Sequence, residues 1–334
     1  MFNKINIKWL IGSFVVLLLL TVLVVLINHS KSTVSKNRTF QSELTDFDTT
    51  NVTRITIIQK TGGEPIDLVK NKDDWKIYAK EQEYNADPLV IKGMLMSLKS
   101  LRATRIAANS KDQWKKYEVT DSAATHVMIN EGKKVVADIY LGKFSYQQPK
   151  NNNPYMYQQQ GTMTSYVRIA GDKHVYATDG MIAMSFNRQA SDFRNRTLIR
   201  SNKDKWNRLA FTTPEKSFSL TKQGNNWMID GLTTDSASVV SYLSTLARLS
   251  SSAFVEESVL TSQNPLYALS IEGENIAVPI KIQAFPADTV NQFAVTSSLN
   301  EGTYFSGSKN GLFDKIFIEK ESLLKILSTN TDHP

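Results

Sequence analysis

The sequence predicts an α+β fold: an N-terminal transmembrane helix followed by two tandem repeated modules, each a mainly antiparallel sheet packed on a helix. One observation is an internal repeat, which indicates a duplicated architecture. The other is a long apolar run near the N-terminus. We expect the modules at residues 51–200 and 205–328. The repeated segments are Ile66-Asp-Leu-Val-Lys70 with Trp75-Lys-Ile77, and Phe218-Ser-Leu-Thr-Lys222 with Trp227-Met-Ile229.

The apolar run from Trp9 to Ile27 contains no charged residue. As a helix it would extend roughly 28 Å, enough to cross the hydrocarbon of a bilayer. A cleaved signal peptide is the alternative, but no small-x-small cleavage site follows Ile27. We therefore expect an uncleaved single-pass anchor at 9–27.

The residues around the anchor suggest its orientation. Lysines and arginine flank both ends, so the positive-inside rule is nearly balanced. The short segment before the anchor favours a cytoplasmic tail at 1–8, and the polar segment 28–50 reads as a stalk. We expect an inner (cytoplasmic) membrane protein with most of the chain extracytoplasmic, in the periplasm.

The net charge of +7 comes mostly from the region around the anchor. Removing the five basic residues of positions 1–38 from the total of 39 leaves 34 basic against 32 acidic residues, a net of +2. A nucleic-acid partner is therefore not expected. The chain has no cysteine, which excludes disulfides, thiolate metal sites and a cysteine nucleophile.

The first module opens with a predicted hairpin that turns at 61–65 and continues into a strand at Trp75 and Ile77. Asp87 and Pro88 then predict the start of a helix, with Asp87 as the cap and Pro88 as the first helical residue. Apolar residues follow at helical spacing up to Leu101. Strands are expected at 127–129, 135–141, 166–169 and 175–177, before a segment 179–199 that is helical at its start.

The second module repeats this order, with Asp235 as the helix cap. Strands are expected at 269–271, 278–285, 292–296 and 303–305, and the last helical stretch at 313–327. Trp75 and Trp227 could stack on a ligand. Their equivalent positions in both copies instead favour core residues that pin the helix to the sheet.

We expect no catalytic, cofactor-binding or metal-binding residue, and so not an enzyme. His126 and His174 have no second ligand at metal-binding spacing, which favours a structural role for each. The acidic pairs Asp73-Asp74 and Glu256-Glu257 are interpreted as solvated surface, because sequence neighbours on strands point apart. No nucleotide-binding or hydrolase motif occurs.

A proline- and amide-rich stretch from Tyr146 to Gly161 interrupts the strands of the first module only. We expect a long exposed loop, and long loops in compact domains are often functional. Tyr146, Tyr155 and Tyr157 are candidate contacts to a partner protein or a cell-wall glycan. A tolerated flexible insertion is the alternative.

The predicted hairpin, tryptophan and capped helix, together with three short motifs, resemble the bacterial family of domain of unknown function 4340. The motifs are Tyr140-Leu-Gly142, Tyr166-Val-Arg168 with Val175-Tyr176, and Asp192-Phe-Arg194. Members of that family are commonly encoded beside ABC-type transport components, including those associated with gliding motility. The resemblance implies an accessory subunit outside the membrane and brings no catalytic residues.

We therefore expect a non-enzymatic, membrane-anchored scaffold or accessory protein of an ABC-type transport or gliding-related complex. Its partners would be integral-membrane or ABC transporter subunits. The alternative is a cell-wall or glycan-binding module that uses the 146–161 loop. A hydrolase with an unfamiliar site is a third hypothesis, supported only by scattered carboxylates.

Overall fold

The computed structural model describes residues 42–60, 62–72, 74–148, 161–308 and 311–324. The expected cytoplasmic tail, the expected anchor at 9–27 and most of the expected stalk lie outside these ranges, as do Tyr155 and Tyr157. Within them, no helix has the length and apolar character needed to cross a membrane.

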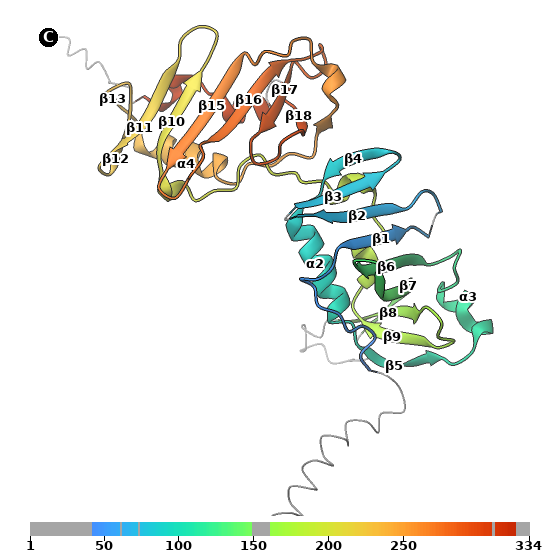
Figure 1. Ribbon diagram of the computed structural model, residues 1–334. Helices are drawn as coiled ribbons and strands as arrows, with labels where there is room; N and C mark the ends of the chain where they lie inside the picture. Colours follow the sequence, from blue (N-terminus) through green and yellow to red (C-terminus); the bar gives the residue numbers. More distant parts are fainter. Residues whose placement is uncertain (1–41, 61, 73, 149–160, 309–310, 325–334) are drawn as a thin grey trace, which may run out of the picture.

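The first module is built on a nine-stranded sheet in which all neighbouring strands are antiparallel, in the order β4-β3-β2-β1-β6-β7-β8-β9-β5 (Figure 1). Alternate residues of its central strands are fully buried, which is the pattern of a sheet with one face on a core. The strands are β1 (Arg54–Ile58), β2 (Ile66–Asn71), β3 (Asp74–Ala79), β4 (Gln82–Asn85), β5 (Ala103–Ala108), β6 (Thr125–Glu131), β7 (Lys134–Gln147), β8 (Thr162–Ile169) and β9 (Val175–Asp179).

The second module has a nine-stranded antiparallel sheet with the same strand order, β13-β12-β11-β10-β15-β16-β17-β18-β14. This confirms the prediction of two repeated sheet modules. Its strands are β10 (Trp206–Thr212), β11 (Phe218–Gln223), β12 (Asn226–Ile229), β13 (Leu232–Thr233), β14 (Phe254–Val255), β15 (Tyr267–Gly273), β16 (Ile280–Pro286), β17 (Phe293–Ser297) and β18 (Tyr304–Ser306).

One long helix per module supplies the other side of each core: α2 (Pro88–Lys99) and α4 (Ser236–Leu246). The Asp87 carboxylate accepts a hydrogen bond from the Leu89 amide at 2.9 Å, and the Asp235 carboxylate accepts one from Ser238 at 2.8 Å. Both predicted caps are therefore confirmed. The buried faces comprise Ile91, Met94, Leu95 and Leu98 in α2, and Val239, Tyr242, Leu243 and Leu246 in α4.

Each module closes with a short 3₁₀ helix that returns to the start of its long helix. These are η4 (Ala190–Phe193) and η7 (Lys320–Leu323). The Phe193 carbonyl accepts a hydrogen bond from the Asp87 amide, and the Leu323 carbonyl accepts one from the Asp235 amide. Phe193 and Leu323 therefore occupy equivalent positions, and the residues around them can be compared directly between the two copies.

Several predicted elements differ from the structure. The segment 179–199 contains only the 3₁₀ helices η3 (Ile182–Ser185) and η4, and the described part of 313–327 contains the short α5 (Leu312–Ile316) and η7. β16 begins at Ile280, not at 278, because the chain bends at Val278 and Pro279 has no amide hydrogen for the strand ladder. Trp75 is buried in the core as predicted, whereas Trp227 is only partly buried against it.

The remaining helical segments are short. η2 (Lys111–Gln113) and α3 (Trp114–Tyr117) follow β5, whereas η5 (Lys203–Lys205) precedes β10 and η6 (Glu257–Val259) follows β14.

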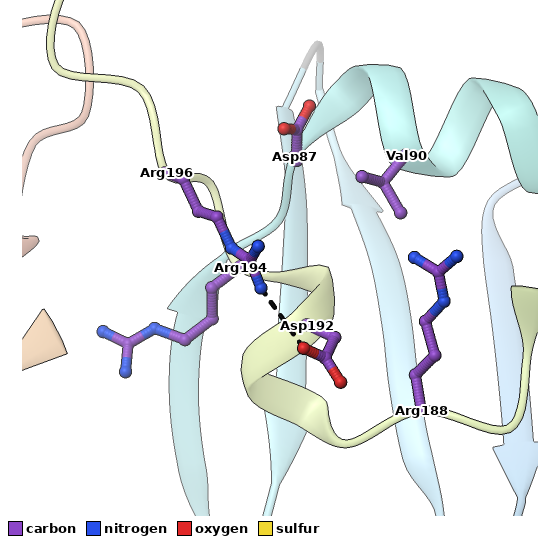
Figure 2. A pocket seen from close by; sticks show the side chains of 6 residues that line it. All are labelled: Asp87, Val90, Arg188, Asp192, Arg194 and Arg196. Atoms are coloured by element: carbon purple, nitrogen blue, oxygen red, sulfur yellow. Dashed lines mark hydrogen bonds and ion pairs between the residues drawn. The ribbon is translucent and has the colours of Figure 1, made fainter. Parts of the chain in front are cut away.

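Side chains of both modules meet where the chain passes from one to the other. The Asn85 amide donates to the side chain of Asn300 at 3.0 Å, and the Asn300 amide donates to the Asn195 carbonyl at 2.8 Å. The Arg194 guanidinium lies 3.9 Å from the ring centres of both Tyr84 and Phe254. Figure 2 shows the Arg194 side chain directed away from Asp192. A cation between two rings therefore joins the modules.

We predict that Leu98→Ala lowers the free energy of unfolding of the first module by about 2–5 kcal/mol, because it opens a cavity under a fully buried side chain. Met96→Ala is the matched control on the same helix, since Met96 is 51% exposed, and it should change stability by less than about 0.5 kcal/mol. Urea unfolding measures both values. Equal effects of the two substitutions would contradict the packing of α2 described above.

Candidate functional site

The face of the first sheet that points away from α2 carries a row of side chains in register. Ile58 of β1 pairs with His126 of β6, His126 pairs with Tyr140 of β7, and Tyr140 pairs with Arg168 of β8. These positions alternate with the fully buried Ile57, Val127, Ile139 and Val167, so they belong to the opposite face. We call this surface the open face.

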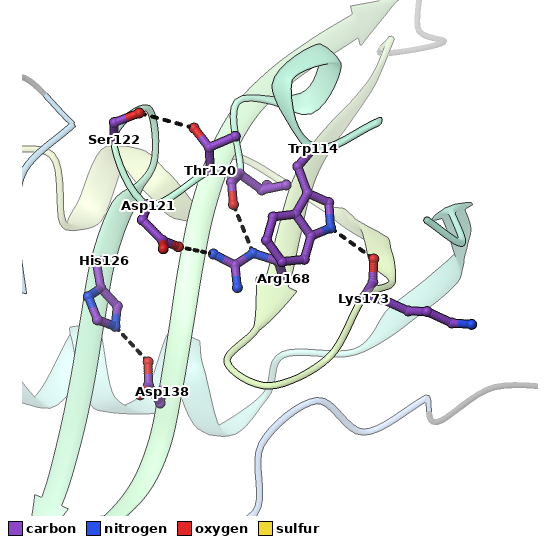
Figure 3. A network of polar contacts seen from close by, with 9 residues as sticks. Trp114, Thr120, Asp121, Ser122, His126, Asp138, Arg168 and Lys173 are labelled. Carbon is purple, nitrogen blue, oxygen red and sulfur yellow. Dashed lines mark hydrogen bonds and ion pairs between the residues drawn. The ribbon is translucent and has the colours of Figure 1, made fainter. Parts of the chain in front are cut away.

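Four planar groups form a continuous stack on the open face. The rings of His126 and Tyr140 are parallel within 5° with centroids 4.1 Å apart. The Arg168 guanidinium lies 3.7 Å from the centre of the Tyr140 ring and 3.9 Å from that of Trp114. We call His126, Tyr140, Arg168 and Trp114 the stack. Three of its members come from adjacent strands, and Trp114 comes from α3. Figure 3 shows the Trp114 ring beside the Arg168 side chain.

Arg168 fastens the segment after β5 to the sheet. Its side chain is only 4% exposed, and it donates from Nε to the Val119 carbonyl at 2.8 Å and from Nη2 to Asp121 at 2.6 Å (Figure 3). Trp114 adds a hydrogen bond from its indole nitrogen to the Lys173 carbonyl at 2.8 Å. A buried cation needs such partners, so the segment and the stack depend on each other.

Gly142 lets this segment approach β7. A Cβ atom at this position would collide with the Tyr117 carbonyl oxygen and the Val119 side chain. Gly142, the glycine of the Tyr140-Leu-Gly142 motif, and Arg168 thus have the same effect, because both allow residues 117–121 to pack against the sheet.

Burial and neighbouring charges shift the pKa of the Tyr140 hydroxyl. Burial raises the pKa of Tyr140, the negative charge of Asp121 raises it further, and Arg168 opposes the change. The Tyr140 hydroxyl is therefore neutral at physiological pH. The His126 ring forms a 2.6 Å hydrogen bond with Asp138, and Asp121 is 78% exposed beside the stack. The site thus combines half-buried rings with exposed polar atoms.

His126 of β6 and His174, which lies just before β9 and not within a strand as expected, each have an aspartate partner. Asp138 reaches His126 through the pairing of β6 with β7, and Asp172 lies 2.7 Å from the His174 ring. Within the described ranges, the one hydrogen bond of the His126 ring is that to Asp138, and no group of three or more potential metal ligands occurs. The hydrogen bond to Asp138 therefore orients the His126 ring within the stack.

The second module lacks the stack. The strand register aligns the two sheets: the pair Val127 and Ile139 of the first corresponds to the pair Leu269 and Ile282 of the second. The residues equivalent to His126, Tyr140 and Arg168 are therefore Ala268, Gln283 and Thr296. The same sheet therefore forms without these side chains. The stack is an addition to the first module and not a requirement of the fold.

Of the sequence-predicted contact residues, Tyr155 and Tyr157 lie outside the described residues, and Tyr146 lies away from the stack. Tyr146 is not in a loop but in β7, paired with Met163 of β8, so the expected loop from Tyr146 to Gly161 begins too early. The strand continues because β8 offers a partner for residues up to Gln147. Tyr146 is 51% exposed, and its ring lies where a Cβ on Gly161 would be. Its position is separate from the stack.

A family model described as Domain of unknown function (DUF4340) matches residues 75–269, more than half of the 334 residues. The chain belongs to this family. The DUF4340 match runs from β3 to β15, so it includes the whole stack and the segment that links the two modules. No curated protein and no solved structure matches the chain.

Sequence reasoning missed the stack, although the motif Tyr166-Val-Arg168 was noticed as part of the family resemblance. An arginine within a strand pattern was the available signal, because a charged residue in the middle of a sheet needs partners. Those partners, Val119 and Asp121, are 49 and 47 positions away in the chain and could not be identified from spacing.

We predict that Arg168→Gln releases the segment 110–124 from the sheet. The loss of the donor to Val119 should weaken attachment by about 1–3 kcal/mol, while the exposed Asp121 adds little. Tryptic cleavage after Lys115 and Lys116 should then accelerate roughly tenfold or more. Arg105→Gln, an exposed arginine on β5, is the control and should leave the cleavage rate unchanged. Unchanged cleavage in Arg168→Gln would show that Arg168 does not hold this segment.

Proposed function

We propose that this DUF4340 protein is a membrane-anchored, non-enzymatic extracytoplasmic scaffold or accessory protein of an ABC-type transport or gliding-related complex. It would present the open face of its first module to an integral-membrane partner. The observation that carries the proposal is the difference between the two copies: one framework occurs twice, and the stack occurs only once.

The open face has the composition of a recognition surface. Aromatic and arginine side chains are enriched at protein interfaces and dominate their energetics. Tyr78 is 40% exposed on the same face of β3, and Asp121 offers a carboxylate beside the stack. The stacked groups are already held in place, so a partner would lose little binding energy to ordering side chains.

The second module fits a supporting role in the same proposal. At the positions equivalent to the stack it carries small or polar side chains, Ala268, Gln283 and Thr296. The contacts of Asn85 and Arg194 join it to the first module. The apolar run at 9–27 supports a membrane-proximal location, since it precedes the first module by only a short stalk.

Glycan binding is the second candidate function, and the exposed aromatic residues at the end of β7 favour it. Phe144 is 49% exposed and Tyr146 is 51% exposed. Such rings can stack on sugars. In this case, Tyr146→Ala would reduce retention of the full-length protein on purified cell-wall material, whereas Arg168→Gln would not. Retention that is absent or unaffected by Tyr146→Ala removes this candidate.

We predict that a photo-crosslinking amino acid at Tyr78 captures an integral-membrane protein when the full-length chain is expressed in its own membrane. The same group at Lys281, which is exposed on the corresponding face of the second sheet, is the matched control and should capture much less. Mass spectrometry of the products identifies the partner. An ABC permease or ATPase subunit would support the proposed complex, and equal capture at both positions, or none, would contradict recognition through the open face.

A further inference from the structure

A polar pocket of about 320 Å³ lies at the end of the first module, between the start of α2 and the segment around η4. The N-cap of α2 and the helix itself contribute one lining residue each, and the return segment contributes the other four. The lining residues are Asp87, Val90, Arg188, Asp192, Arg194 and Arg196 (Figure 2).

The two carboxylates of the pocket already have hydrogen-bond donors. Asp87 accepts from the Leu89 amide at the start of α2. Asp192 accepts from the Gln189 amide at 3.1 Å and from Arg196 Nη2 at 3.2 Å. The three arginines of the lining carry one positive charge more than these two carboxylates can offset.

The guanidinium groups of Arg188 and Arg196 have N–H donors that no described residue accepts. Arg188 donates from Nε to the Met184 carbonyl at 3.1 Å, and no ion pair of Arg188 occurs within the described ranges. Among the described residues, the Nε atom of Arg196 is buried and has no hydrogen-bond partner. Buried donors are nearly always satisfied in proteins, so such an atom indicates an absent acceptor. Figure 2 shows Arg188 on one side of Asp192 and Arg196 on the other.

The second copy again serves as a comparison. Because Phe193 and Leu323 are equivalent, Ile318, Ser322 and Leu324 occupy the positions of Arg188, Asp192 and Arg194. The closing 3₁₀ helix forms there without any arginine. The arginines of this pocket are thus not needed to close the module.

We propose that the pocket binds a singly charged oxyanion, a carboxylate group, between Arg188 and Arg196. A small rotation of the Arg196 side chain would uncover its buried Nε, so that one oxygen accepts from this atom and the other from the free donors of Arg188. The start of α2 adds a favourable potential. Asp87 and Asp192 disfavour a doubly charged ligand, because like charges in the same pocket repel. The ligand class is therefore a carboxylate in preference to a phosphate dianion.

The test uses the full-length chain labelled with ¹⁵N-arginine, and follows the Nε–H signal of Arg196 during titration with sodium acetate at constant pH and ionic strength. A saturable shift with a roughly millimolar dissociation constant is expected. Arg188→Gln should weaken binding about tenfold or more, and Arg188→Lys, which keeps the charge but loses the planar fork, should weaken it less. Arg200→Gln, an exposed arginine outside the pocket, should leave the affinity unchanged.

Titration with phosphate at pH 8 distinguishes the ligand classes. Binding weaker than that of acetate supports a singly charged ligand, and tighter binding overturns that preference. A shift of the Arg196 signal that does not saturate, or an affinity that Arg188→Gln leaves unchanged, overturns the site itself. Neither outcome bears on the capture of a membrane partner by the open face, since no membrane protein takes part in this measurement.

Discussion

Arg168 lies between the rings of Tyr140 and Trp114 and donates hydrogen bonds to Val119 and Asp121. A guanidinium that is 4% exposed is stable only if its charge and its donors are accommodated, so the segment after β5 must stay in place. One interaction thereby determines the position of Trp114, the access to Tyr140 and the exposure of Asp121. The recognition surface proposed for the first module depends on it.

The duplicated framework separates what the fold requires from what has been added to it. Both copies keep the strand order, the aspartate cap and the hydrogen bond from that aspartate to the closing 3₁₀ helix. The copies differ on the open face and at the end of the first module. The shared architecture does not account for those differences. The stack and the arginine pocket are therefore the stronger candidates for functional sites.

Local patterns were sufficient to predict the two long helices and the repeated hairpins, because a cap and a periodic apolar face act over a few residues. The edge strands β5 and β14 were not predicted. Each is added to its sheet by pairing with β9 or β18, and their formation depends on partners distant in the chain. The predicted loop began too early, at Tyr146, for the same reason: pairing with the distant strand β8 extends β7 to Gln147. The stack depends on the register of three strands, which no sequence spacing reports.

The most direct test of recognition through the stack is hydrogen exchange of the full-length chain, measured in native membranes and in lipid bilayers without other membrane proteins. Slower exchange in native membranes is predicted for amides of residues 110–124, β6 and β7, with no change in β15 and β16. Equal exchange of the first-module segments in both preparations would contradict the account, as would protection that extends equally to both sheets.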